Sequence, residues 1–141
     1  MKKRELVIKV VVFIMFAAGL VMGLIYLLRP TLMPFHFAFL SKTQDQLEPR
    51  TFELLMTMKR VIGAHFLAIS FGALLLAGRL AKGDVFVRWS VLVMVLISQL
   101  ILLYAGYIVQ NGIVLKSVNV IEIVLVLFVF FLSKRRETEA R

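Results

Sequence analysis

The stretch WSVLVMVLISQLILLYAGYIV, residues 89–109, contains no charged side chain. A helix of about 20 apolar residues crosses the roughly 30 Å hydrocarbon core of a bilayer. Three further segments have similar length and character, so we predict membrane spans at residues 6–28, 61–80, 89–109 and 113–133. Spanning segments must be helical, because lipid cannot satisfy free backbone groups. The sequence therefore predicts an all-α polytopic membrane protein, a four-transmembrane-helix bundle forming one domain over residues 1–141.

The composition of the whole chain agrees with this fold class. Of 141 residues, 61% are hydrophobic, and the mean hydropathy is +0.94. A soluble chain of this length could not bury so much apolar surface in one core. The net charge of +9 comes from residues clustered between apolar runs, not from a basic face interleaved with aromatics, so we expect no nucleic-acid partner. The lack of cysteine excludes disulfides and thiolate metal sites.

The distribution of lysine and arginine predicts the orientation of the spans. The apolar run after the basic N-terminus extends to Leu28, too long for a signal-peptide core, so we interpret it as a retained first span. Eleven of the 17 basic residues lie near the termini or around residues 79–88, and six lie on the other side. The richer side is cytoplasmic. We therefore expect both termini, including a charged tail at residues 134–141, in the cytoplasm, and the bacterial inner membrane as the location.

One substantial connection, residues 29–50, is expected on the outer side, as is a short turn at residues 110–111. The segment PFHFAFL, residues 34–40, is too short to span and rich in aromatics, which favours the headgroup region. Asp45 followed by Glu48 resembles a capping box, and Pro49 can occupy a first helical turn. The second helix is therefore expected to begin near Pro49, ahead of its span.

Glu122 is the sharpest candidate for a functional group, because it lies near the middle of the fourth span. A carboxylate there is costly, so it should face the bundle interior and find a polar partner. Counted from the outer ends of their spans, His65 and Asn119 lie less than about 10 Å deep, and Gln99 lies about one turn deeper, as Glu122 does. With Arg60 at the rim, these residues define a candidate polar pocket. The alternative is a structural hydrogen bond that orders the helices.

On the cytoplasmic side of Glu122 the spans contain few polar side chains. The fourth span has no polar side chain between Glu122 and Ser133, whereas a channel or proton relay needs polar groups through to the cytoplasmic face. No phosphate loop, HExxH sequence, nucleophile elbow or pair of carboxylates is present. We therefore expect no metal and no cofactor. Enzymatic activity stays open only within the bilayer, around Glu122.

Small residues form two seams. Gly19 and Gly23 make a GxxxG pattern in the first span, and Gly63, Ser70 and Ala77 follow heptad spacing in the second. In lipid such seams drive helix association through close packing, within one chain or between copies. They indicate helix-packing residues, and they point to other membrane subunits or self-association as partners beside the bilayer itself.

Four sequence features mark the ends or the middle of the predicted spans. They are Arg29-Pro30 after the first span, residues 59–64 entering the second, residues 104–112 closing the third, and Glu122 in the fourth. In these features the chain resembles the small four-helix bacterial membrane proteins of DoxX-like and neighbouring families of unknown function. Those families often have a Gly-Gly pair after the second-span arginine, where this chain has Gly63-Ala64, and an arginine in the third span, where it has Gln99. The resemblance implies a fold class, and extends to no site residue beyond Arg60 and Glu122.

The sequence favours a non-enzymatic role. The chain would pack against partner proteins or lipids, and an accessory subunit of a larger membrane complex is one form of that role. The alternative is a binder or transporter of a small or amphiphilic ligand, using an outward-facing polar pocket around Glu122. A cavity of a few hundred Å³ that opens outward would favour the alternative, and a filled bundle interior with an extensive protein contact along the first or second span would favour packing.

Overall fold

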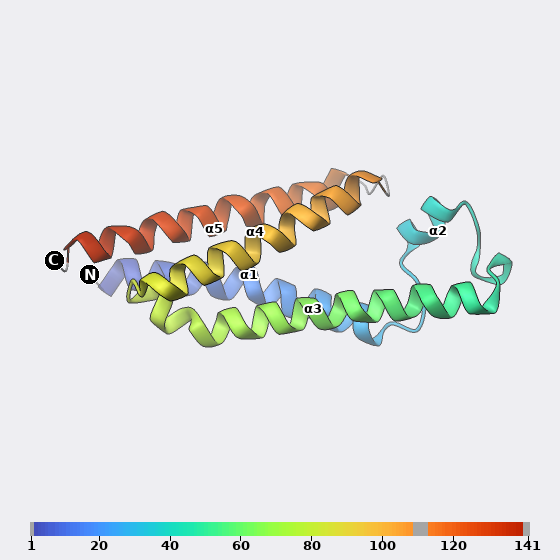
Figure 1. The fold of residues 1–141 in the computed structure, drawn as a ribbon, viewed down its shortest axis with the longest axis horizontal. Coiled ribbons are helices and arrows are strands. Elements are labelled where there is room, and N and C mark those ends of the chain that lie inside the picture. Colours follow the sequence, from blue (N-terminus) through green and yellow to red (C-terminus); the bar gives the residue numbers. More distant parts are fainter. Residues whose placement is uncertain (1, 109–112, 140–141) are drawn as a thin grey trace.

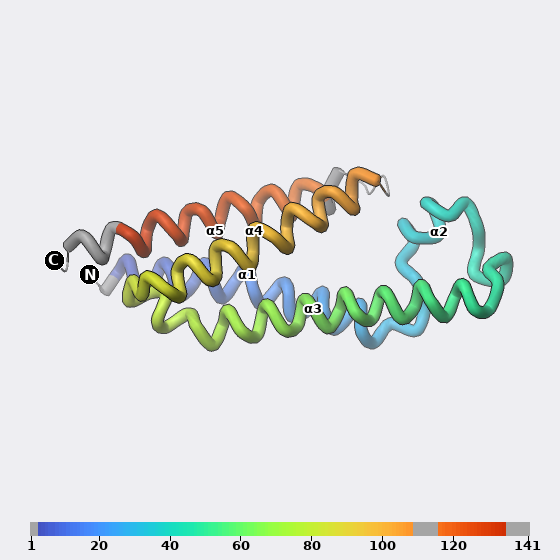
Figure 2. The backbone as a smooth tube through the Cα atoms, viewed as in Figure 1, coloured from blue at the N-terminus to red at the C-terminus, as the bar shows by residue number. Residues whose placement is uncertain are grey.

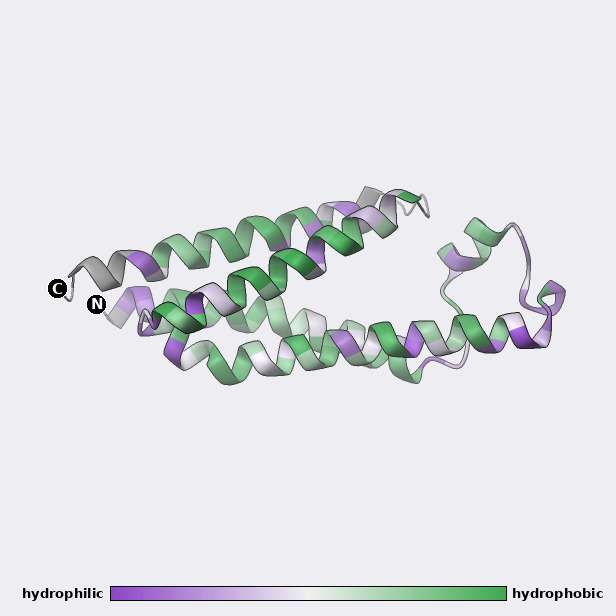
Figure 3. Cartoon of the chain, viewed as in Figure 1, coloured by the Kyte–Doolittle hydropathy of each residue, from purple (hydrophilic) through white to green (hydrophobic). Residues whose placement is uncertain are grey.

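Helices account for nearly all of the chain that the structure describes. This computed structural model describes residues 2–108 and 113–139. The helices are α1 (Lys2–Leu28), α2 (Pro34–Leu40), α3 (Pro49–Ala81), α4 (Val85–Ile108) and α5 (Ile113–Glu139), with a 3-10 turn, η1 (Gln44–Gln46), before α3 (Figure 1). The helices α1, α3, α4 and α5 are each long and apolar enough to cross a membrane, and Figure 3 shows apolar residues along all four. The predicted fold class is confirmed.

The four spanning helices form two pairs. The α1 helix packs along α3, and α4 packs along α5, whereas the α1–α5 and α3–α4 contacts that join the pairs are less extensive. The pairs come together at the end that holds both termini, here called the closed end, and diverge toward the end that carries α2, the open end (Figures 1 and 2). The main core of buried aliphatic side chains includes Ile8, Leu80, Val87 and Val126. This core draws on all four spanning helices.

Small residues allow α1 to approach α3 closely. A Cβ atom on either Gly23 or Gly63 would lie 2.9 Å from the carbonyl oxygen of the other. A Cβ atom on Gly19 would lie 2.2 Å from Ser70 Oγ. The structure thus places these four predicted packing residues in the α1–α3 contact, while Ala77 packs against the main core. Both seams found in the sequence therefore serve contacts within one chain.

The connection from α3 to α4 at the closed end is a tight turn. Gly83 has a φ of 83°, the left-handed conformation that glycine adopts without a Cβ penalty. The amide of Gly83 donates to the Leu80 carbonyl at 3.0 Å, and the amide of Asp84 donates to the Arg79 carbonyl at 3.2 Å. These two bonds form a Schellman motif that satisfies the last carbonyl groups of α3.

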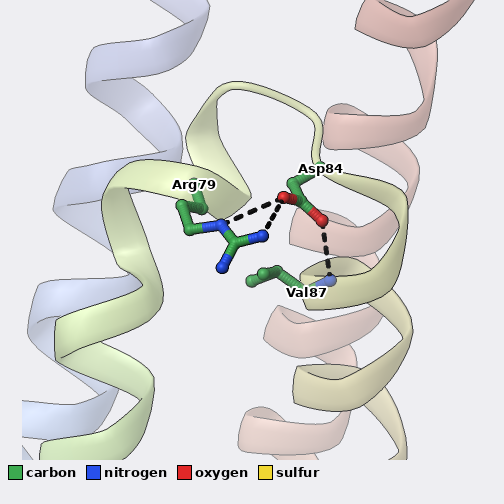
Figure 4. Close-up of polar contacts among 3 residues, drawn as sticks. All are labelled: Arg79, Asp84 and Val87. Carbon is green, nitrogen blue, oxygen red and sulfur yellow. Dashed lines mark hydrogen bonds and ion pairs between the residues drawn. The ribbon is translucent and has the colours of Figure 1, made fainter.

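Asp84 also starts the next helix (Figure 4). Its Oδ1 accepts the amide of Val87 at 3.1 Å, and its Oδ2 accepts two hydrogen bonds from the Arg79 guanidinium, at 2.7 and 3.0 Å. The hydrogen bond from Val87, followed by those from Arg79, holds the pKa of Asp84 below its usual range. With this cap α4 begins at Val85, one turn before the predicted span at residue 89.

At the open end α3 is longer than the bilayer requires. Its 33 residues extend about 50 Å, against about 30 Å of hydrocarbon. The connection between α1 and α3 folds back on the first turns of α3, where Leu32, Leu47 and Met56 form a second, smaller cluster. The α3 helix begins at Pro49 as predicted.

Two expectations for the connecting segments need correction. Glu48 is the N-cap residue of α3 but makes no side-chain cap bond. The capping box is instead formed by Thr43 and Gln46 around η1, with the Thr43 amide donating to Gln46 Oε1 at 2.9 Å. The predicted tail at residues 134–141 is not a separate segment, because α5 continues to Glu139. Residues 140–141 and the predicted turn at residues 110–111 lie outside the described residues.

Candidate functional site

Side chains from all four spanning helices surround a small cavity, here called the junction cavity. Its volume is about 30 Å³, which is room for a single water-sized species. The lining residues are Met15, Phe16 and Gly19 of α1, His65, Phe66, Ile69 and Ser70 of α3, Val95, Ser98 and Gln99 of α4, and Glu122 of α5.

The polar centre of this cavity is a hydrogen bond between α4 and α5. Nε2 of Gln99 donates to Oε2 of Glu122. The Gln99 side chain is 5% exposed, and its Oε1 atom is buried without a hydrogen-bond partner. Within the described part of the chain Glu122 makes no ion pair. The carboxylate therefore faces another helix and not lipid alone, and the amide that holds it still has an unused acceptor.

A second polar contact joins α3 to α4. His65 Nε2 lies 3.3 Å from Ser98 Oγ. No carboxylate contacts His65 among the described residues, so the pair lacks the group that orients histidine in a hydrolase triad. The described residues also contain no group of three or more histidine, cysteine or carboxylate side chains that could hold a metal ion. These contacts offer hydrogen bonding but no acid–base constellation.

The structure brings three of the five predicted pocket residues together. Gln99, Glu122 and His65 all line the junction cavity, whereas Asn119 and Arg60 do not. Asn119 is half-buried on α5, and Arg60 is exposed on α3. Sequence reasoning missed the two serines of the cavity, although Ser98 is adjacent to Gln99 and Ser70 belongs to the small-residue seam. The sequence alone could not show that their hydroxyl groups line a cavity, because this depends on how the helices pack.

Lys59, and not its neighbour Arg60, is the buried cation at the open end. Its side chain is 2% exposed, and Nζ donates to the backbone carbonyls of Arg29 and, at 3.0 Å, Thr31. Both carbonyls lie just beyond the end of α1 at Leu28, so the cation satisfies backbone acceptors where the chain leaves the helix. A signal was present in the sequence: Lys59 lies four residues before Gly63 and so shares the face of α3 that contacts α1.

A larger apolar cavity, here called the α2 cavity, lies between α2 and α3. It has a volume of about 200 Å³, and its lining residues are Leu32, His36, Phe39, Leu40, Leu55, Met58, Lys59 and Ile62. The α2 helix has no fully buried residue, so it covers this cavity loosely. His36 Nδ1 accepts the Met33 amide at 3.1 Å. Burial, and then the charge of Lys59, lowers the pKa of His36, which favours the neutral ring that this bond requires.

Comparison of the chain with protein-family models, with curated proteins and with solved structures finds no match.

Proposed function

We propose that this protein is a small integral membrane component that packs against a partner helix at its open end, as an accessory subunit does. The observation that carries the proposal is a seam on α3 with alternating spacings of three and four residues, the a/d pattern of interacting helices. Within it the side chains of Met58 and Ile62 are 55% and 37% exposed. The seam comprises Leu55, Met58, Ile62, His65 and Ile69.

The position of this seam supports a protein partner. Lipid-facing residues need no particular spacing, whereas a packed helix needs a regular one. The seam runs from the α2 cavity, which Leu55, Met58 and Ile62 line, to the junction cavity, which His65 and Ile69 line. The α2 cavity is apolar and of a size to receive a large side chain from a partner. A partner helix lying along the seam would complete the packing of the open end.

The volume of the junction cavity favours packing over the alternative role. Pockets for organic ligands usually measure about 300–1,000 Å³. The space beside Glu122 is about 30 Å³, too small for an organic or amphiphilic ligand. The resemblance to DoxX-like families adds an expectation about the fold and none about activity.

The test is purification from the native membrane in mild detergent, followed by mass spectrometry. We expect a second membrane protein, or a second copy of this chain, in stoichiometric amount. Ile62→Trp should abolish the association, because the bulky indole ring would block the seam. Leu75→Trp is the matched control: Leu75 is 70% exposed on a different face of α3 and should tolerate the change. Recovery of the chain alone with a bound small molecule, or equal effects of the two variants, would overturn the proposal.

The proposed orientation places the closed end in the cytoplasm of a bacterial cell, at its inner membrane. The excess of basic residues at that end supports it. Because the chain has no cysteine, single substitutions Ser41→Cys and Lys82→Cys give unique labelling sites. An impermeant thiol reagent added to intact cells should label position 41 and leave position 82 unlabelled. Labelling of both positions from the same side would contradict the orientation.

A further inference from the structure

Side-chain oxygen atoms outnumber nitrogen atoms among the polar groups that line the junction cavity. Gln99 already donates Nε2 to Glu122, which leaves Gln99 Oε1 buried and unpartnered. Glu122 contributes carboxylate oxygens and no donor when it is ionised. The hydroxyl groups of Ser70 and Ser98 add two more oxygen atoms to the lining. A species that fits this cavity must therefore donate hydrogen bonds or coordinate oxygen.

The charge of the cavity further restricts which species could occupy it. An ionised carboxylate within the hydrocarbon region is costly unless a counter-charge lies close to it. In the described part of the chain no cation pairs with Glu122. Lys116, the basic residue nearest to it along α5, lies against the ring of Tyr107, with Nζ 5.9 Å from the ring centroid. One monovalent cation would neutralise Glu122, whereas a divalent cation would leave an excess positive charge in the bundle.

The size of the cavity and the type of its donor atoms limit which cation it can hold. A volume of about 30 Å³ admits one ion or one water molecule and excludes organic ammonium groups that carry side chains. The oxygen atoms of Gln99, Glu122 and the two serines are hard donors, which suit alkali and alkaline-earth cations and not soft metals. The small volume favours a small alkali cation over a larger one. His65, which also lines the cavity, is exposed, so the cavity is not sealed on the α3 side.

We propose that the junction cavity is a binding site for a single Na⁺ ion, coordinated by Glu122, Gln99 Oε1 and the hydroxyl groups of Ser98 and Ser70. The ion joins α4 and α5 to α3 where the two helix pairs begin to separate. Binding of this ion stabilises the junction of the pairs. The site goes beyond the packing role, and its failure would leave that proposal unaffected.

The experiment measures thermal unfolding of the purified protein in detergent at constant ionic strength, with N-methylglucamine chloride replaced stepwise by NaCl. Trp89, the single tryptophan, packs edge-on against Phe130 with ring centroids 4.8 Å apart and reports on tertiary structure by its fluorescence. We expect a saturable rise in Tm of a few degrees with Na⁺ and a smaller rise with K⁺. Glu122→Gln should abolish the Na⁺ dependence. Glu53→Gln, an exposed carboxylate on α3, should retain it.

Equilibrium binding of radioactive ²²Na⁺ to the unmodified protein does not depend on whether the variants fold. We expect a saturable stoichiometry of one ion per chain. A Tm that is independent of Na⁺, an equal Na⁺ response in Glu122→Gln, or no saturable ²²Na⁺ binding would each overturn the proposal. The last result would assign the cavity to a water molecule.

Discussion

The two ends of the bundle are stabilised in different ways. At the closed end, a Schellman turn and the Arg79–Asp84 pair join α3 to α4 over three residues. At the open end, one buried ammonium group, that of Lys59, binds the backbone where α1 ends. The connection from α1 to α3 covers the α2 cavity only loosely. Local hydrogen bonds thus fix the closed end, while the open end depends on a few long-range contacts and retains space.

The largest effect on stability is expected for Lys59→Met at the open end. The variant keeps the length of the side chain but leaves the carbonyls of Arg29 and Thr31 without their donor. We expect the free energy of unfolding to fall by about 2–3 kcal/mol, since hydrogen bonds to a charged group contribute about 1.5–3 kcal/mol. Equilibrium unfolding in mixed micelles measures it. Arg60→Met, at an exposed position, is the control and should change stability by less than about 0.5 kcal/mol. Equal losses in both variants would contradict the assignment of Lys59 as the cap.

A smaller effect is expected where α1 meets α3. In Gly63→Ala the new Cβ atom would lie 2.9 Å from the Gly23 carbonyl oxygen, and this backbone atom can move only if the helices separate. Overpacking of this kind costs about 1–3 kcal/mol, and the same unfolding assay measures it. Gly72→Ala is the matched control on the same helix, because nothing lies within 4 Å of its Cβ position. It should be neutral or stabilising by up to about 1 kcal/mol. A loss as large as that of Gly63→Ala would show that helix propensity, and not close approach, decides the outcome.

The smallest effect concerns the closed end and depends on pH. The folded-state pKa of Asp84 is lowered, so its carboxylate adds stability that is fully present above the unfolded pKa, about 3.9. This contribution is lost as the pH falls through the folded pKa. Asp84→Asn should therefore be less stable than the unmodified protein at neutral pH, and the difference should shrink below about pH 4. Unfolding curves between pH 3 and pH 7 measure it. A difference that is constant with pH would mean that the carboxylate charge has no part in the turn.

Much of the fold could be predicted from the sequence because the bilayer restricts it so strongly. The length of each apolar run sets a helix, and the cost of an exposed carboxylate indicates that Glu122 faces another helix. Depth counting placed Gln99 at the level of Glu122, and these two residues form the hydrogen bond. The same counting placed Asn119 near them, but Asn119 does not line the junction cavity. Depth along the span does not specify which face of α5 a residue occupies.

Other features could not be predicted because they depend on how helices turn toward one another. Lys59 and Arg60 are adjacent cations, and only the contact between α1 and α3 decides which of them is buried. Two capping patterns overlap before α3, and both fit the sequence rules, but the 3-10 turn selects Thr43 and Gln46. Cavity volumes follow from the divergence of the helix pairs, which no single span encodes. The small size of the junction cavity, which weighs against an organic ligand, was therefore outside the reach of the sequence.

The bond from Lys59 to the end of α1 also has a consequence for biosynthesis. The Arg29 carbonyl and the Lys59 ammonium are 30 residues apart in the sequence, so α1 emerges from the ribosome well before its cap exists. Until α3 follows, α1 must enter the membrane with its terminal carbonyls satisfied by water or lipid headgroups. Once α3 has been made, Lys59 and the glycines of the α1–α3 contact are present, so this contact can form before α4 is complete. The chain is thus suited to insertion as two successive hairpins, with the turn at Gly83 as the joint between them.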